Sequence, residues 1–495
     1  MKKTALFQGR KMWIWIMLLS ILFGLLVALI SGSLQIKRSI QDDATLECFQ
    51  AHVQERVPAL MKQYRIPGCS MALVHDYEIV WMQAFGYADM ESGRELTADT
   101  PMSVQSITKS LTAWGVMSLA EKGLVDLDAP LSGYLTSWQF PRSNYSLEKV
   151  TIRSLLSHTA GMPLGDFTDV YAPGEVMPTL REKLTQEAVL SREPETGFSY
   201  SNVGYHLLEL LIEEVSGQSF ADYMYSEVFA PLGMERATFH VEQTMAPYPP
   251  TGSDLGGNPV PVYIYPEKAS GGLFATAADI ARFAVAGMKE NPVLNAEHIA
   301  LMYSPQVSKI GVYGLVFDAY GLGHYIEKLP KGLHSVSHGG QGRGIMTHFQ
   351  AVPETGDAIV ILTNSQRSWP FISYLTSDWA RWRAFPTVGM GRILWGQYGL
   401  SAVVGMLYSA SLLIILRIIL AHCQQKRAGI RLLRIGLSLL LLGVLIWFVC
   451  QKYLLISSVF PILSAWLGSG VFVFSTALLI SSVIPHRKRC VPILM

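Results

Sequence analysis

The stretch 101-PMSVQSITKSLTAWGVMSLAEKGL-124 contains the motif on which the fold assignment rests, Ser106-Ile107-Thr108-Lys109. Apolar residues after Ser106 recur at the one-sided spacing of a buried amphipathic helix. In the first turn of that helix Ser106 lies near unpaired N–H groups, and Lys109 falls on the same face. A lysine held against an apolar core can lose its proton and act as a base. The pair is therefore a candidate nucleophile and base.

The same four-residue pattern occurs a second time, at Ser146-Leu147-Glu148-Lys149. This copy lies in the polar run 141-PRSNYSLEKV-150, which is typical of a surface loop. The pattern alone therefore identifies no site, and only the helical context favours the first copy.

The chain as a whole is more apolar than an ordinary soluble protein, with 495 residues, 50% hydrophobic content and a mean hydropathy of +0.28. Near the N-terminus, residues 12–30 are long enough to cross a bilayer and exceed a typical signal-peptide core. This favours a retained anchor, although Ser31-Gly32-Ser33 could be a cleavage site. Three further candidate spans are expected at about 398–420, 435–456 and 462–484.

Basic residues flank these spans in a consistent way. They precede the first span, fill 421–434 between the second and third, and follow the last at 486–489. The positive-inside rule then places both termini in the cytoplasm and the central region outside. We expect a signal anchor at 1–35, an extracytoplasmic domain at 36–385 and a three-helix transmembrane region at 386–495.

Other classes of function receive little support. A net charge of +1 gives no reason to expect a nucleic-acid partner. The five cysteines match no metal spacing and no disulfide framework, and Cys69 is expected to be a buried thiol. The spans carry almost no ionisable residues away from their ends, which disfavours a transporter.

The central region reads as an α+β domain with an antiparallel sheet and an inserted helical lobe. The expected elements are a helix at 42–64, strands at 69–74 and 79–88, the Ser106 helix, a mostly helical stretch to about 290, and strands at 345–352 and 357–364. A site could lie where the lobe meets the sheet.

A serine–lysine pair needs a second proton carrier and donors for an oxyanion. Tyr200-Ser201-Asn202 is the only Tyr-x-Asn in the chain, and His338-Gly339-Gly340 is the only His-x-Gly. Each has a plainer interpretation, because the first could be a helix N-cap and the second a Gly-rich hairpin turn.

The three motifs in this order resemble those of the serine β-lactamase and penicillin-binding-protein superfamily, in its class C and D,D-peptidase-like branch. The supporting stretches are 152-IRSLLSHTAGMP-163, 231-PLGMERATF-239 and 269-ASGGLFATAADIARF-283. The resemblance covers about 45–370. It implies a β-lactamase/D,D-peptidase-like fold, here with one N-terminal and three C-terminal transmembrane helices.

The resemblance also implies roles for the motif residues. Ser106 would be the acylated nucleophile and Lys109 its proton acceptor. Tyr200 would relay the proton to the leaving group, and Asn202 would bind substrate. No metal or cofactor is implied.

The third motif would complete the site. His338 would hold Tyr200 or a substrate anion, and Gly340 would let substrate approach the strand. The backbone N–H groups of Ser106 and Gln341 would form the oxyanion hole. His158, in the Ser-His-Thr-Ala-Gly stretch, is expected to be structural.

The function so implied is that of a serine hydrolase in a bacterial cytoplasmic membrane, acting outside on a peptide, ester or lipid-linked substrate. A peptidase for a D-amino-acid peptide, cell-wall or prodrug-type substrate is favoured; a D-alanyl (teichoic-acid) esterase and a penicillin-binding sensor that is acylated without turnover remain alternatives. The layout is similar to a membrane-anchored branch that includes the colibactin-activating D-aminopeptidase and teichoic-acid esterase-like proteins.

Two departures from that branch weaken the expectation of a free-amine substrate. Ser103 stands where the D-aminopeptidases carry an acidic residue, and Gly342 stands where an amide side chain is expected. Arg343 could bind a substrate carboxylate or be a solvated surface residue. The oligomeric state is not predicted.

Overall fold

The protein is described by a computed structural model that covers residues 2–31, 40, 44–166, 168–423, 432–451 and 455–483. It divides into two compact units, one formed by 39–392 and one by 1–38 together with 393–495. Some expected features lie outside the described residues. These are most of the Ser-Gly-Ser cleavage candidate, the basic residues at 424–431 and the basic residues at 486–489.

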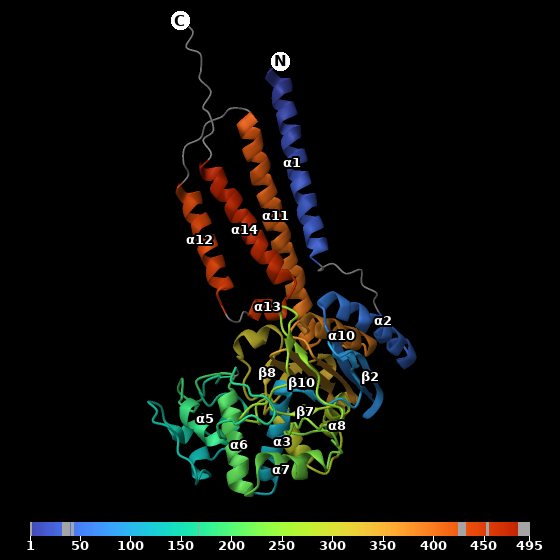
Figure 1. Cartoon of the computed structure of the whole chain (residues 1–495), viewed down its shortest axis with the longest axis vertical. Helices are drawn as coiled ribbons and strands as arrows, with labels where there is room; N and C mark the ends of the chain where they lie inside the picture. Colours follow the sequence, from blue (N-terminus) through green and yellow to red (C-terminus); the bar gives the residue numbers. More distant parts are fainter. Residues whose placement is uncertain are drawn as a thin grey trace. The chain divides into compact units, whose positions relative to one another are not determined.

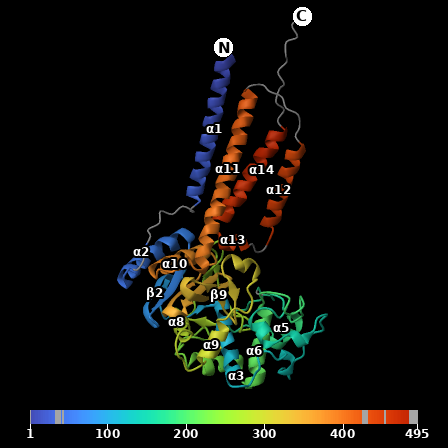
Figure 2. The same ribbon diagram turned by 180° about the vertical axis from the view of Figure 1, so that it is seen from behind.

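The smaller unit consists of apolar helices, drawn side by side in Figure 2. Its helices are α1 (Lys2–Ile30), α11 (Ile393–Cys423), α12 (Leu432–Val449), α13 (Leu455–Val459) and α14 (Leu463–Val483). Four helical stretches are long and apolar enough to cross a membrane: Met12–Ile30, Gly389–Leu420, Leu432–Val449 and Leu463–Ser482. The second begins before the expected position 398, because 393-ILWGQ-397 carries no charge that would end the apolar helix.

Glycines let α1 and α11 approach each other closely within this unit. A Cβ built on Gly24 would lie 2.4 Å from the carbonyl oxygen of Gly405. Small residues at such a crossing are typical of helix pairs in membranes, where packing replaces the hydrophobic effect.

The larger unit is built on an eight-stranded antiparallel sheet of order β3-β2-β1-β12-β11-β10-β9-β8. Its strands are β1 (Gly68–His75), β2 (Glu78–Asp89), β3 (Arg94–Glu95), β8 (Ala319–Tyr320), β9 (Tyr325–Lys328), β10 (His334–Gly342), β11 (Ile345–Val352) and β12 (Asp357–Thr363). The first strands of the domain pair with the last, since Cys69 of β1 lies opposite Thr363 of β12. The expected antiparallel sheet is confirmed.

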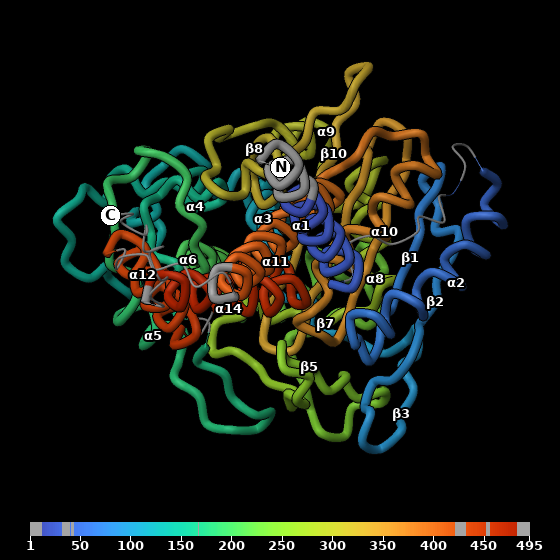
Figure 3. The backbone as a smooth tube through the Cα atoms, turned by 90° about the horizontal axis from the view of Figure 1, so that it is seen from above, coloured from blue at the N-terminus to red at the C-terminus, as the bar shows by residue number. Residues whose placement is uncertain are grey.

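The two faces of the sheet are covered by different helices. α2 (Leu46–Tyr64) and α10 (Trp369–Trp382), from opposite ends of the domain sequence, lie side by side (Figures 1 and 3). The Trp382 ring stacks on Phe49, with centroids 4.5 Å apart, and its N–H donates to the Ala44 carbonyl. α8 (Ala277–Ala286) packs on β1, β2, β11 and β12.

Because side chains alternate along each strand, they are divided between the apolar layers on the two faces of the sheet. Val360 and Leu362 of β12 join the cluster that contains α3 and α8, while the intervening Ile361 is equally buried but lies outside that cluster. The strands therefore have apolar residues on both faces, which explains their nearly continuous apolar sequences.

The helical lobe follows the Ser106 segment. Its helices are α3 (Thr108–Glu121), α4 (Ile152–Leu156), α5 (Leu180–Glu187), α6 (Asn202–Ser216) and α7 (Phe220–Met224), and α9 (Ala296–Met302) follows α8. Short strand pairs join the lobe to the sheet: β4 (Met102–Ser103) with β7 (Phe274–Ala275), and β5 (Gly252–Ser253) with β6 (Pro259–Val260).

Candidate active site

Ser106 lies in a tight 3₁₀ turn, Gln105–Ile107, that leads into α3. We expected it in the first turn of the α-helix, which instead begins at Thr108. The difference arises at Gln105, whose φ of +52° is in the left-handed region that a glutamine rarely adopts. The Gln105 amide donates to the Ser103 hydroxyl (2.7 Å) and accepts from Tyr265 (3.1 Å). These contacts hold the strained turn in place.

Lys109 is fully buried, and its amine lies within hydrogen-bonding distance of three oxygen atoms. Its Nζ lies 3.2 Å from the Ser106 Oγ, 2.8 Å from the Asn202 Oδ1 and 2.7 Å from the Ser270 carbonyl oxygen. Burial lowers the pKa of Lys109 well below its usual value of 10.5.

A neutral lysine amine has two hydrogens and one lone pair. The Ser270 carbonyl and the Asn202 Oδ1 can only accept, so each takes one hydrogen from Lys109. The remaining lone pair is then left for the hydroxyl of Ser106. In this arrangement the amine can accept the serine proton.

Tyr200 and Asn202 reach the pair from the N-terminus of α6. Burial raises the pKa of the Tyr200 phenol well above 10, and the neighbouring Ser106 side chain opposes that rise. The Tyr200 ring also lies 4.9 Å from the Lys109 Nζ. The N-cap interpretation applies to Ser201, whose hydroxyl accepts from the Gly204 N–H at 2.9 Å. Capping by Ser201 leaves the Asn202 side chain available to Lys109.

The strand β10 brings His338, Gly340 and Gln341 to the same region. Its side chains alternate, so Gly340 faces the Ser106 turn, where a Cβ would lie 2.2 Å from the Val104 carbonyl oxygen. Only glycine allows this close approach. Gln341 points to the other face and accepts from the Trp369 N–H at 3.0 Å. Its backbone, rather than its side chain, is the part that remains near the turn.

His338 lies between Tyr320 and Tyr200 and contacts both side chains. Its Nδ1 lies 2.8 Å from the Gly339 carbonyl oxygen and must carry the hydrogen, because a carbonyl only accepts. Its Nε2 lies 3.3 Å from the Tyr320 hydroxyl, whereas the His338 and Tyr200 ring centroids are 6.4 Å apart. Burial first, and the nearby Lys109 second, lower the pKa of His338 well below 6.5. The side chain is therefore a neutral partner of Tyr320.

His158 packs against Tyr200 and accepts a hydrogen bond from the residue that follows it. Its Nδ1 accepts from the Ser201 N–H at 3.2 Å, and its ring centroid lies 4.3 Å from that of Tyr200 and 4.9 Å from that of Tyr320. These contacts fit the structural role expected from the sequence.

The second Ser-x-x-Lys lies on the surface. Ser146 is exposed, and Lys149 pairs with Glu193 at 3.1 Å. Lys109 is buried, whereas the Lys149 side chain is 48% exposed.

Sequence reasoning missed three residues that support Lys109: Ser270, His206 and Glu209. Ser270 acts through its carbonyl, which no sequence pattern reveals. His206 and Glu209 did leave a signal, since with Asn202 they are polar residues at i, i+4 and i+7 on one face of a helix whose neighbouring residues are mostly leucine.

Three residues that could together bind a metal ion lie near α6. Oxygen or nitrogen atoms of Glu187, His206 and Glu267 come within 4.8 Å of one another. However, the Lys183 ammonium donates to Glu187 at 2.7 Å and to Asp169 at 2.9 Å, and it lies 4.0 Å from Glu267. The lysine supplies the positive charge that a metal ion would bring.

Comparison with known proteins agrees with this architecture. The Beta-lactamase family model matches residues 53–376. Penicillin-binding protein 4 of Amycolatopsis lactamdurans is 27% identical over 338 residues, which are 66% of this chain and 88% of that protein.

Solved structures show the same likeness. The octameric penicillin-binding protein homologue from Pyrococcus abyssi is 27% identical, with a TM-score of 0.57 over 67% of this chain and 77% of that one. The crystal structure of SurE with D-Leu is 25% identical, with a TM-score of 0.56 over 69% of this chain and 77% of that one.

The family match spans the three motifs and the sheet that carries them, from α2 to α10. The chain therefore belongs to the β-lactamase and penicillin-binding-protein family of serine hydrolases.

Proposed function

We propose that the protein is a membrane-bound serine hydrolase that works through an acyl-enzyme formed on Ser106. Lys109 takes the hydroxyl proton as the serine oxygen attacks the carbonyl carbon of an amide or ester. The leaving group departs with a proton, and a water molecule then releases the acyl group. The arrangement that carries this proposal is the buried Lys109 amine, 3.2 Å from the Ser106 Oγ, with its two hydrogens directed elsewhere.

The other site residues have supporting roles in this proposal. Tyr200, which lies beside Ser106 and Lys109, carries the proton to the leaving group. Asn202 binds substrate in addition to orienting Lys109. The backbone N–H groups of Ser106 and Gln341 stabilise the oxyanion, since such donors act most strongly in a site that excludes water.

For the substrate we propose a peptide containing a D-amino acid, presented outside the membrane. Two observations support it: the family includes penicillin-binding proteins, and the similar SurE structure contains D-Leu. The helices long and apolar enough to span a bilayer support a membrane location, with the 39–392 unit outside and both termini in the cytoplasm.

A substrate panel tests this function on the full-length protein in detergent. The panel contains D-alanyl and D-leucyl peptides, their L-isomers, D-alanyl esters and a penicillin. We expect turnover of a D-peptide and none of its L-isomer. Turnover of esters alone would replace the peptidase with an esterase. Stable acylation by penicillin without turnover of any compound would indicate a sensor.

A further inference from the structure

One face of α6 carries a row of polar side chains directed into the protein. Asn202, His206 and Glu209 are separated by about one and two helical turns, and they lie among buried leucines and valine (Figure 1 shows α6 in the lobe). Asn202 bonds Lys109 directly. The other two residues contact a single short segment, Lys268–Ser270.

Glu209 and His206 bond this segment at successive residues. The Glu209 Oε2 accepts from the Lys268 N–H at 2.6 Å and from the Ala269 N–H at 2.8 Å. The His206 Nε2 lies 2.8 Å from the Ser270 Oγ. On the other side, Thr112 of α3 donates to the Ala269 carbonyl at 2.8 Å. The segment is therefore held between α3 and α6.

The residue at the end of this segment meets the candidate base. The Ser270 carbonyl oxygen accepts from the Lys109 Nζ at 2.7 Å. Hence, among the described residues, His206 and Glu209 make no hydrogen bond to Ser106 or Lys109. They nevertheless fix the position of the group that takes one of the two Lys109 hydrogens.

We propose that His206 and Glu209 are positioning residues that keep the Ser270 carbonyl directed at Lys109 and thereby keep the amine lone pair directed at Ser106. This inference rests on the proposed function of Ser106 and Lys109. A displaced carbonyl would leave one N–H without its acceptor, and the amine would rotate toward another one. The lone pair would then no longer meet the serine hydroxyl.

His206 is suited to this task in its neutral form. It is surrounded by Lys109 of α3, by Lys183 and Glu187 of α5, and by Glu267, whose Oε1 lies 3.8 Å from the His206 Nδ1. Burial first, and the two lysines next, lower the pKa of His206 well below 6.5. The Nδ1–H then points toward the Glu267 carboxyl, and Nε2 accepts from the Ser270 hydroxyl.

Glu209 offers a variant that separates hydrogen bonding from charge. In Glu209→Gln the amide oxygen can still accept both backbone N–H groups, because it has two lone pairs. In Glu209→Leu neither bond remains. Burial raises the pKa of Glu209 to about 7. Comparison of the two variants therefore shows whether the segment needs the two hydrogen bonds or the charge.

The test measures how fast a fluorophosphonate probe labels the full-length protein in detergent as its concentration is varied. We expect His206→Phe, Ser270→Ala and Glu209→Leu each to lower the maximal labelling rate about tenfold or more, because small misplacements of a reacting group have effects of this size. The probe concentration at half-maximal rate should stay unchanged, and Glu209→Gln should retain the normal rate.

A double-mutant cycle makes the test specific. If His206 acts through the Ser270 hydroxyl, His206→Phe combined with Ser270→Ala should be no slower than either single variant. If the double variant is slowed by the product of the two single effects, the inference is wrong. Normal labelling rates in His206→Phe, Ser270→Ala and Glu209→Leu would also overturn it. If His206→Phe fails to fold, the labelling rate of Ser270→Ala alone tests the inference, because that change removes one hydroxyl and keeps the carbonyl.

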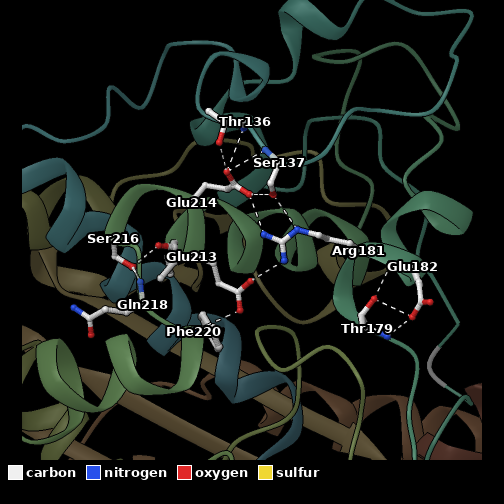
Figure 4. A network of polar contacts seen from close by, with 11 residues as sticks. Thr136, Ser137, Thr179, Arg181, Glu182, Glu213, Glu214, Ser216, Gln218 and Phe220 are labelled. Atoms are coloured by element: carbon white, nitrogen blue, oxygen red, sulfur yellow. Dashed lines mark hydrogen bonds and ion pairs between the residues drawn. The ribbon is translucent and has the colours of Figure 1, made fainter.

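The matched control lies on the same helix but faces away from Lys109. Glu214 accepts hydrogen bonds from Thr136, Ser137 and Arg181 (Figure 4). Glu214→Gln should label at the normal rate. Labelling that survives Ser106→Ala would contradict the proposed function itself, whereas normal rates in the α6 variants with loss in Ser106→Ala would contradict only this inference.

Discussion

At the scale of single residues, the site depends on a strained backbone position next to the proposed nucleophile. The left-handed conformation of Gln105 costs on the order of 1–3 kcal/mol for a residue that is not glycine. The bonds of its amide to Ser103, Tyr263 and Tyr265 offset that cost. One of these bonds is accepted by the Ser103 hydroxyl, so Ser103 helps to hold the turn.

Tyr200→Phe tests the proposed proton carrier. The change removes one hydroxyl and little volume, so the fold should be kept while turnover of a D-peptide falls. General acid–base groups typically contribute about 10²–10⁴-fold. Steady-state kinetics should show this loss in kcat, with Tyr145→Phe, an exposed tyrosine, as the control. A Tyr200→Phe variant with normal kcat would make Tyr200 a packing partner of His158 only.

The neighbours of Ser106 and Lys109 could be predicted from the sequence only in part. The sequence predicted that Ser106 and Lys109 lie together, and the structure places Asn202 and Tyr200 beside them. It could not predict the Ser270 carbonyl, since a backbone acceptor has no residue signature. It also could not predict the bond between His338 and Tyr320, which depends on how β8 and β10 pair through β9.

At the scale of elements, α6 serves two purposes on two faces. Its inner face meets Lys109 and the 268–270 segment, and its outer face joins the α5 region through Glu213 and Glu214. The sequence predicted the strands near both ends of the domain, because those segments have clear apolar patterns, and it indicated a possible helix N-cap where α6 begins. It did not predict β8 to β10, since His338–Gly342 is mostly glycine and fits against the Ser106 turn for that reason.

The outer face of α6 should contribute stability that depends on pH. Burial alone would raise the pKa of Glu214, but hydrogen bonds from Ser137, Thr136 and Arg181 lower it from 4.5 to about 2. Because the folded pKa is the lower one, this stabilisation is present above pH 4.5 and is lost as pH falls from 4.5 toward 2.

Chemical denaturation at a series of pH values measures this effect. The free energy of unfolding should fall less steeply below pH 4.5 in Glu214→Gln than in the unmodified protein. Identical slopes in the two proteins would show that the carboxylate contributes nothing to stability. Tyr145→Phe, a change in an exposed residue elsewhere, provides the control for general acid effects.

At the scale of the whole molecule, a short connection joins the hydrolase unit to the apolar helices. The 3₁₀ turn Gly389–Arg392 is bonded to the hydrolase unit, where the Gly389 N–H donates to Glu327 at 2.6 Å and Arg392 pairs with Asp318 at 3.3 Å. α11 begins at the next residue, Ile393. We propose that the spans serve to bring the site to a substrate presented by the membrane.

A protein limited to residues 39–392 tests that proposal. It should hydrolyse a small soluble D-peptide at the rate of the full-length protein and lose activity selectively on the same peptide attached to a lipid in vesicles. Equal loss on both substrates would mean that the spans stabilise the fold. Equal retention on both would reduce them to a tether.

The central claim is that Ser106, and no other serine, is acylated. The most direct measurement is mass spectrometry of the full-length protein after reaction with a fluorophosphonate, followed by peptide mapping. We expect one added probe per chain on the peptide that contains Ser106, no addition in Ser106→Ala, and normal addition in Ser146→Ala. A probe that still adds to Ser106→Ala, or one that maps to Ser146, would contradict the central claim.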